Sequence, residues 1–329
     1  MKLASLKRGG RDGSLIVADQ EMVRGVLVPD VAPTLQYALE NWKEVVPALC
    51  HVSDQLGQRD LPGTFAIIPD ELASPLPRAY QFLDGSVYLS HMEKARKARN
   101  AAMPAEHETV PLMYQGMSDD FLAPTEAAPF LDDKLGIDLE AEIAVVVDDV
   151  PMGINDTEAL EHIKLVMLLN DWTLRELTRF EVPRGFGFIQ SKPASAFSPF
   201  AVTLDELGSA WRGGVLDLVL NSSVNGSPVG APRAGQDMYF NYGELIAHAA
   251  RSRKLGAGTI IAAGTVSNRD ERSGHGCIAE VRVDETIASG APTTAFLTFG
   301  DSVRIEMFGH DGRSVCGAIE QTVVRAKAN

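Results

Sequence analysis

The sequence has few of the features that mark membrane, exported or disulfide-bonded proteins. None of its apolar runs reaches the roughly 18 residues that a membrane-spanning helix needs. The first residues, MKLASLKRG, contain no apolar signal core, so we expect no export signal. The three cysteines, Cys50, Cys277 and Cys316, do not have the spacing of a metal or disulfide motif. These absences predict a cytoplasmic protein with free thiols.

Positive charge is also scarce. Against 44 aspartates and glutamates there are 30 lysines and arginines, which gives a net charge of −14. This balance argues against nucleic acid as a partner, and we expect no membrane partner either. An anionic small molecule would need a local cluster of Arg and Lys. A length of 329 residues, 45% of them hydrophobic, is ordinary for a globular enzyme of about two domains.

The first 78 residues are predicted to form a small α/β domain that ends in a proline-rich linker. We expect strands over Lys2–Leu6 and Ser14–Ala18 around a glycine-rich turn, which is a hairpin signal. A helix is expected over Leu35–Leu56, and Pro47 should kink or split it. Prolines at positions 62, 69, 75 and 77 mark the linker. The second predicted domain covers residues 79–329.

The larger domain has many strand patterns and few helical ones, without regular alternation between the two. A strand is expected over Ile278–Val283, and Asn225-Gly226 predicts a tight hairpin turn. A helix is expected over Tyr242–Leu255, with Asn241 as its cap. This pattern favours a β-rich α+β fold over a doubly wound parallel sheet.

Four carboxylates and one histidine carry most of the chemistry that the sequence indicates. Glu140 and Glu142 stand two apart at the head of an apolar run, so on a strand both would point to the same face. Asp171 lies in an Asn-Asp-Trp segment, and Asp84 lies seven residues before His91. Converging carboxylates repel one another, and a hard cation such as Mg²⁺ or Ca²⁺, or Mn²⁺, removes that conflict. We therefore predict an oxygen-ligand metal site with a histidine base beside it.

Each of these residues also has a simpler interpretation when taken alone. The two glutamates could lie on the solvent face of an edge strand, and Asp171 could cap a helix expected over Leu174–Arg179. His91 could be an ordinary core or surface histidine, and Lys192 a solvated lysine. Glu280, inside an apolar run, either faces water or has a buried partner. A histidine partner would make Glu280 the group that orients a base.

In combination, these residues resemble the fumarylacetoacetate hydrolase family, whose members cleave carbon–carbon bonds in β-diketo acids. The resemblance runs from about Ala79 to Phe308 and depends on the order and spacing of short motifs. The motifs are Asp84-x6-His91, Tyr114-Gln115-Gly116, Glu140-x-Glu142, Asn170-Asp171-Trp172-x-x-Arg175, Lys192, Ser198-Pro199, Gly264-Thr265 and Glu280. Residues 1–78 also resemble the extra amino-terminal domain of the fumarylacetoacetase type, which single-domain members lack.

The resemblance implies a mixed β-sandwich roll, usually a homodimer, with a divalent metal at its mouth. It implies four metal ligands, namely Asp84, Glu140, Glu142 and Asp171. It implies that His91 is the general base and that Glu280 orients it. The residues implied to hold or contact the substrate are Lys192, Arg175, Tyr114, Thr265 and, for a distal carboxylate, Arg99 or Arg96.

The implied substrate is a small anionic β-diketo acid. The expected reaction is hydrolysis of fumarylacetoacetate to fumarate and acetoacetate, a step of tyrosine breakdown. Ser86 and Val182 replace expected tyrosines and Thr178 replaces a glutamine, all in substrate contacts. Acylpyruvate hydrolysis, oxaloacetate decarboxylation, keto-acid isomerisation and non-catalytic binding of a small acid therefore stay open as alternatives. Lys94 stands where some acylpyruvases and decarboxylases carry a glutamate, which favours the fumarylacetoacetase type.

Overall fold

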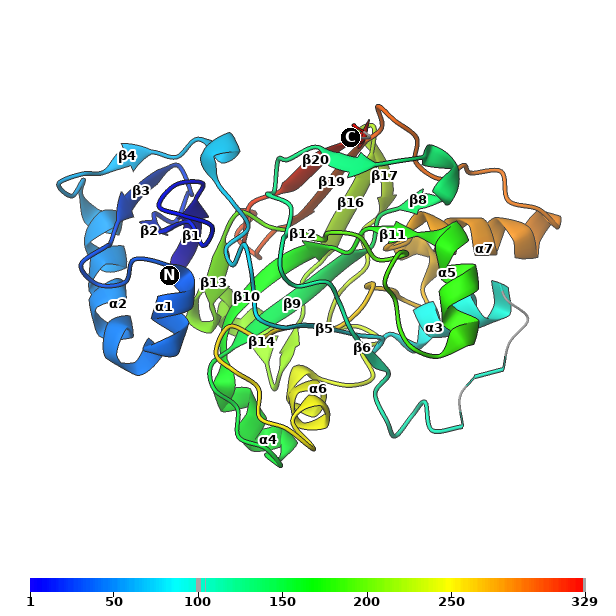
Figure 1. Cartoon of the computed structure of the whole chain (residues 1–329), viewed down its shortest axis with the longest axis horizontal. Helices are drawn as coiled ribbons and strands as arrows, with labels where there is room; N and C mark the ends of the chain where they lie inside the picture. Colours follow the sequence, from blue (N-terminus) through cyan, green and yellow to red (C-terminus); the bar gives the residue numbers. More distant parts are fainter. Residues whose placement is uncertain (99–101, 104, 328–329) are drawn as a thin grey trace.

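The computed structural model describes residues 1–98, 102–103 and 105–327, and two β-sheets dominate this part of the chain (Figure 1). In the larger sheet the spatial order is β4 (Phe65–Ala66), β3 (Arg24–Leu27), β2 (Ser14–Ala18), β1 (Lys2–Leu6), β13 (Ala201–Thr203), β10 (Ile163–Asn170), β9 (Ala141–Val147), β18 (Ile260–Ala262), β5 (Phe82–Gly85) and β6 (Met113–Gln115), with β12 (Ala196–Phe197) paired to β10. In the smaller sheet the order is β17 (Ser227–Gly230), β16 (Leu220–Val224), β19 (Ser302–Met307), β20 (Ile319–Arg325) and β7 (Ala128–Phe130).

Helices and short strand pairs surround these sheets. The helices are α1 (Leu35–Glu40), α2 (Trp42–Gln58), α3 (Leu89–Ala98), α4 (Asp156–Ala159), α5 (Arg175–Glu181), α6 (Tyr242–Ala249) and α7 (Ile278–Ser289). The strand pairs are β8 (Ile137–Asp138) with β11 (Thr173–Leu174) and β14 (Trp211–Arg212) with β15 (Val215–Leu216). No helix in the described ranges combines the length and the apolar character needed to cross a bilayer. The β-rich α+β fold predicted from the sequence is confirmed.

Strand β9 shows how the large sheet is buried on both faces. All seven of its residues are buried, and its β-branched valines suit a strand in that environment. Successive side chains point to opposite faces, so Ile143 and Val145 pack in the core that includes the smaller sheet. Ala144 and Val146 pack in a second core with α1 and α2. The amino-terminal helices therefore cover the face of the large sheet that the smaller sheet leaves open.

The amino-terminal strands are found where the sequence predicts them. Strands Lys2–Leu6 and Ser14–Ala18 pair antiparallel, and Leu3 also pairs with Ala201 of β13. The predicted helix is split, but the break falls at Asn41 and not at Pro47, which lies inside α2. At Asn41 the backbone leaves helical geometry (φ −123°, ψ 30°), and the side-chain amide donates to the last turn of α1.

One prediction about the site region is wrong. The apolar run Ile278–Val283, predicted as a strand, begins helix α7, so Glu280 lies in the first turn of a helix. The carboxylate of Asp138 accepts hydrogen bonds from the first two N–H groups of α7, at 2.8 and 2.9 Å. Because this carboxylate comes from a distant part of the chain, the local sequence does not show that a helix can start here.

Two local motifs in the second half of the chain behave as predicted. Asn225 (φ 51°) and Gly226 (φ 77°) form the turn between β16 and β17, with the left-handed backbone that a two-residue hairpin turn requires. Asn241 caps α6 in a reciprocal capping box with Glu244. Helix α6 ends at Ala249, six residues earlier than predicted. Helices α3, α5 and α7 lie together on the side of the molecule opposite the amino-terminal strands (Figure 1).

Candidate active site

Strand pairing in the large sheet brings three buried carboxylates together. Ala262 of β18 pairs with Asp84 on one side and with Ala144 of β9 on the other. Glu142 pairs with Leu169 near the end of β10, and Asp171 follows that strand. One carboxylate oxygen from each of Asp84, Glu142 and Asp171 lies within 4.8 Å of the other two, and all three residues are at most 3% exposed. Three of the four predicted metal ligands therefore converge.

The electrostatics of these carboxylates fit a cation. Burial, followed by the charge of Asp171, raises the pKa of Asp84 to about 8. Burial and the charge of Asp84 raise the pKa of Glu142 well above its usual value. Among the described residues, Oδ1 of Asp84 and Oε2 of Glu142 have no hydrogen-bond partner. Each buried carboxylate oxygen without a hydrogen-bond partner destabilises the fold by about 1–3 kcal/mol or more. Carboxylate oxygens are also the ligands that Mg²⁺, Ca²⁺ and Mn²⁺ prefer.

Glu140, the fourth predicted ligand, lies outside this group and binds two cationic side chains. Its Oε1 accepts a 2.7 Å hydrogen bond from Nη2 of Arg175, and its Oε2 a 2.5 Å bond from Nζ of Lys192. Burial raises the pKa of Glu140, but the charges of Lys192 and Arg175 outweigh burial and lower it. Lys192 also donates to Asp171 and to Oγ1 of Thr173, the latter at 2.8 Å. A metal-binding role for Glu140 stays a prediction.

Asp138 is a residue of the site that the sequence analysis missed. It is fully buried, and Oδ2 accepts a 2.8 Å hydrogen bond from Nε of Arg175 while the carboxylate also caps α7. Asp138 thereby links the cation that holds Glu140 to the helix that carries Glu280. A signal was present, because Asp138 continues the two-residue spacing of Glu140 and Glu142.

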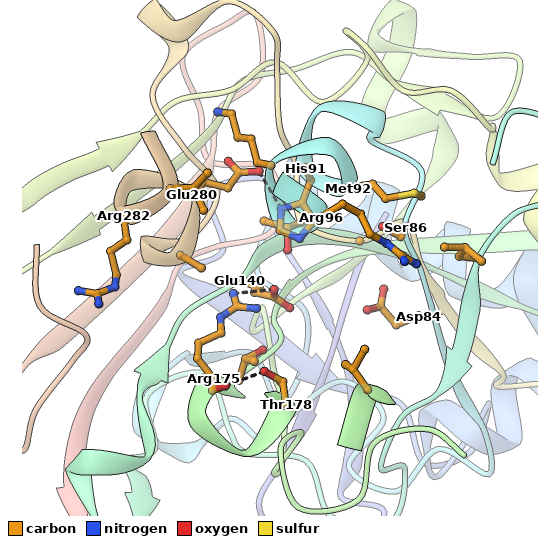
Figure 2. A pocket seen from close by; sticks show the side chains of 18 of the residues that line it. Asp84, Ser86, His91, Met92, Arg96, Glu140, Arg175, Thr178, Glu280 and Arg282 are labelled. Atoms are coloured by element: carbon orange, nitrogen blue, oxygen red, sulfur yellow. Dashed lines mark hydrogen bonds and ion pairs between the residues drawn. The ribbon is translucent and has the colours of Figure 1, made fainter. Parts of the chain in front are cut away.

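The predicted base and its predicted orienting group are in contact. Nδ1 of His91, on α3, lies 2.7 Å from Oε1 of Glu280, on α7 (Figure 2). Burial raises the pKa of Glu280, but the neighbouring His275 and the hydrogen bond with His91 lower it below its usual value, so this carboxylate is ionised. An ionised carboxylate only accepts hydrogen bonds, so Nδ1 of His91 carries the hydrogen and Nε2 is the basic nitrogen of the neutral ring.

The remaining predicted residues are placed as follows. Oη of Tyr114 donates to Oδ2 of Asp171 at 2.6 Å, and Oγ1 of Thr265 lies 3.4 Å from Oε1 of Glu142. Ser195, which no sequence pattern singled out, donates to Oδ1 of Asp171 at 2.7 Å. These bonds, with that from Lys192, show that Asp171 is buried in the site and does not cap α5, whose cap is Leu174. Arg99 lies outside the described residues.

A cavity of about 570 Å³ is lined by most of the predicted site residues, but not by Asp171. Figure 2 shows Asp84, Glu140 and Arg175 at one side of it, with His91 and Glu280 opposite. Cationic side chains also line it, namely Lys94, Arg96 and Lys97 of α3, Arg179 of α5 and Arg282 of α7. Apolar lining comes from Leu112, Met113, Val182, Phe188, Ile287, Pro292 and Phe296. The cavity therefore combines local positive charge with apolar walls in a chain that is strongly negative overall.

The sequence positions that depart from the family pattern lie in this cavity. Ser86, Thr178 and Val182 all line it. Each is smaller than the residue that the resemblance leads us to expect. The departures expected from the resemblance therefore lie in the cavity wall.

Two family models match most of the chain. The model of the fumarylacetoacetate (FAA) hydrolase C-terminal domain matches residues 81–324, and that of the fumarylacetoacetase N-terminal domain 2 matches residues 1–78. The fumarylacetoacetase of Oryza sativa subsp. japonica is 26% identical in an alignment of 209 residues, which covers 54% of this chain and 48% of the rice protein. The fumarylacetoacetase of Arabidopsis thaliana is 25% identical in an alignment of 218 residues, which covers 57% of this chain and 49% of that protein. The chain spans about half the length of the curated relatives it matches.

Solved structures share the fold along almost the whole chain. Fumarylacetoacetate hydrolase from Exiguobacterium antarcticum is 18% identical with a TM-score of 0.66, covering 99% of this chain and 100% of that chain. Maleylpyruvate hydrolase from Sphingobium sp. SYK-6, in complex with manganese(II) ion and pyruvate, is 15% identical with a TM-score of 0.67 and the same coverage. The matching family models and the shared fold lead to one conclusion. The chain belongs to the fumarylacetoacetate hydrolase family.

Proposed function

We propose that this chain is a metal-dependent hydrolase that cleaves a carbon–carbon bond in a β-diketo acid. The observation that carries the proposal is the contact of His91 with Glu280 beside a cavity that also holds the buried carboxylate group. Membership of a family of hydrolases and isomerases supports the reaction class. The positive side chains of the cavity suit an anionic substrate.

Asp84, Glu142 and Asp171 would hold the divalent cation, which we propose to be Mg²⁺, Ca²⁺ or Mn²⁺. When bound, the cation would polarise a carbonyl oxygen of the substrate as a Lewis acid. The manganese ion in the maleylpyruvate hydrolase complex supports a divalent ion in this fold. Glu140, bound to Lys192 and Arg175, would fix these two cations at the edge of the carboxylate group.

His91 and Glu280 would then carry out the proton transfers. Nε2 of His91 takes a proton from a water molecule, and the hydroxide that forms adds to one carbonyl carbon of the substrate. Glu280 stabilises the resulting imidazolium. When the carbon–carbon bond breaks, the electron pair passes to the neighbouring carbonyl as an enolate, and protonation of its carbon by His91 restores the neutral base. One water is consumed, and two carboxylic acids are formed.

Lys192 and Arg175 would act on the substrate in different ways. Lys192 has an acceptor for each of its three N–H groups, so it acts on substrate charge through its field. Arg175 uses Nε and Nη2 for Asp138 and Glu140, while among the described residues its Nη1 makes no hydrogen bond. Arg175 is therefore the better candidate to bind a substrate carboxylate directly.

Fumarylacetoacetate, which would give fumarate and acetoacetate, is the first candidate substrate. Acylpyruvates are the second candidate class, because Ser86, Thr178 and Val182 change the cavity wall and because a maleylpyruvate hydrolase shares the fold. Turnover of fumarylacetoacetate, acylpyruvates and oxaloacetate should be measured with Mg²⁺ or Mn²⁺ and with a chelator. Hydrolysis of a diketo acid that the chelator abolishes is expected. Decarboxylation of oxaloacetate without any diketo-acid hydrolysis would contradict the proposal.

A further inference from the structure

A second histidine, His275, lies behind the His91–Glu280 pair. Its side chain is 14% exposed, and it precedes helix α7 by three positions. Nδ1 of His275 lies 3.5 Å from Oε2 of Glu280, and Nε2 lies 3.4 Å from Oδ2 of Asp284. Oε1 of Glu280 is held by His91, whereas Oε2 is buried without a hydrogen-bond partner among the described residues. His275 is therefore placed to hold the second oxygen of the orienting carboxylate.

The same cluster connects helix α3 to helix α7. Lys94 stands three residues after His91 on α3, and its Nζ lies 3.1 Å from Oδ2 of Asp284. Nζ of Lys94 also lies 3.3 Å from Nδ1 of His275. Asp284 is one helical turn beyond Glu280, so both carboxylates lie on one side of α7. Helices α3 and α7 are thus joined by two contacts one turn apart, one between His91 and Glu280 and the other between Lys94 and Asp284.

We propose that His275 is a positioning residue, which fixes the second oxygen of Glu280 and so keeps this carboxylate aimed at His91. The catalytic consequence rests on the proposed function, in which His91 is the base. Neither His275 nor Asp284 lines the cavity. His275 therefore acts through Glu280 and does not touch the substrate.

The charges around His275 explain why it suits this position. The charged groups in contact with it are Lys94 from α3 and Glu280 and Asp284 from α7. His91 and the buried thiol of Cys277 lie near Glu280. Nε2 of His275 faces Oδ2 of Asp284, whereas Nδ1 faces both Oε2 of Glu280 and Nζ of Lys94. Nδ1 donates to Glu280 only in the state in which it carries a hydrogen and does not accept from Lys94, and donation to Asp284 as well needs a hydrogen on both nitrogens. Without His275, Oε2 of this carboxylate, which is 2% exposed, would lose its 3.5 Å contact with a ring nitrogen, and the carboxylate would turn more freely about its terminal bond.

Two conservative substitutions separate the two contacts of His275. In His275→Asn the side-chain amide nitrogen falls near the place of Nδ1, so the variant can still donate to Glu280. In His275→Gln the amide nitrogen falls near the place of Nε2, so the variant keeps the contact with Asp284 and loses that with Glu280. His162→Gln is the matched control, because Nδ1 of His162 also contacts a carboxylate, Oδ1 of Asp148 at 2.6 Å, outside the cavity.

Two measurements on the full chain test the proposal. The first is steady-state kinetics on the best diketo acid across the pH range. We expect kcat to fall roughly 10- to 100-fold in His275→Gln with KM unchanged, and to stay within about threefold of wild type in His275→Asn and in His162→Gln. The acidic limb of the kcat/KM profile should move in His275→Gln and not in the control.

The second measurement does not need turnover. The hydrogen between Nδ1 of His91 and Glu280 should give a downfield proton resonance in the metal-free protein, identified by its loss in His91→Ala. This resonance should persist in His275→Asn and disappear or shift in His275→Gln. Equal effects of the two His275 variants, or no effect of either on the resonance, would overturn the proposal. If no diketo acid is turned over, the proposed function fails, but the resonance still decides whether His275 positions Glu280.

Discussion

Nζ of Lys192 lies 2.5 Å from Oε2 of Glu140, and both side chains are almost fully buried. The same ammonium group donates to Asp171 and to Thr173, so each of its three hydrogens has an acceptor. Burial lowers the pKa of Lys192, but the charges of Asp171 and Glu140 outweigh it and keep the lysine charged. Lys192 thus offsets the negative charges of Glu140 and Asp171 at the edge of the proposed metal site.

Lys192→Met should destabilise the protein strongly. The substitution leaves Glu140 and Asp171 short of a buried positive charge, which typically costs about 3–5 kcal/mol when one partner of a buried pair is removed. Urea denaturation of the metal-free protein would measure the change in unfolding free energy. Arg313→Met, which removes an exposed 3.1 Å ion pair with Glu21, is the control and should cost less than about 1 kcal/mol. Equal stability of the two variants would contradict the role of Lys192.

His91→Ala should separate chemistry from metal binding. Removal of a general base usually lowers turnover by roughly two to four orders of magnitude. The variant should still bind the cation, because His91 is not among the three converging carboxylates. Glu142→Ala should lose both turnover and metal. Isothermal titration with Mn²⁺ and the hydrolysis assay would give the two readouts, and normal turnover in His91→Ala would rule out this histidine as the base.

The metal-free protein should become less stable as the pH rises from about 4 to about 8. Burial and the charge of Asp171 raise the pKa of Asp84 to about 8 in the folded state, against about 3.9 in the unfolded chain. Within that window the folded state binds more protons than the unfolded state, so stability is lost with rising pH. The raised pKa of Glu142, caused by burial and by Asp84, acts in the same direction.

Melting temperatures measured with a chelator at several pH values would test this, and Asp84→Asn should flatten the dependence. Added Mg²⁺ or Mn²⁺ should raise the melting temperature more at high pH than at low pH, because the cation competes with protons for the same carboxylates. A cation effect that does not change with pH would argue against these carboxylates as ligands.

Asp138→Asn should weaken both the fold and the site. Asp138 accepts hydrogen bonds from Arg175 and from the first two N–H groups of α7, and an amide at this place would turn a donor toward donors. We expect a loss of about 3 kcal/mol in unfolding free energy, and a fall in kcat because Arg175 and Glu280 both shift. Asp156→Asn at the exposed start of α4 is the control and should change stability by less than about 0.5 kcal/mol.

Sequence reasoning succeeded where local patterns decide the structure. The strands at Lys2–Leu6 and Ser14–Ala18 follow from apolar runs around a glycine-rich turn, and the cap of α6 follows from Asn241 and Glu244. The family and its fold were accessible because the spacing of the motifs is kept along the chain. The convergence of Asp84, Glu142 and Asp171 was expected from the same motifs, and the structure places them together.

Sequence reasoning failed where a distant residue decides the structure. Helix α7 starts at Ile278 because Asp138 satisfies its first N–H groups, and the apolar run alone resembles a strand. The hydrogen bonds from Lys192 and Arg175 to Glu140 also depend on contacts between separate elements. His275 carries no motif, and only its place behind Glu280 distinguishes it. Such residues are found from coordinates, because their spacing in the chain has no periodic meaning.

The pairing of β1 with β13 determines what removal of residues 1–78 would expose. Leu3 and Ala201 stand opposite each other, so the first strand of the chain covers one edge of β13. Without residues 1–78, β13 would keep β10 as its neighbour and present bare N–H and C=O groups on its other side. An open edge of this kind recruits strands from other molecules. We expect residues 1–78 to prevent such pairing, because β1 covers this edge of β13.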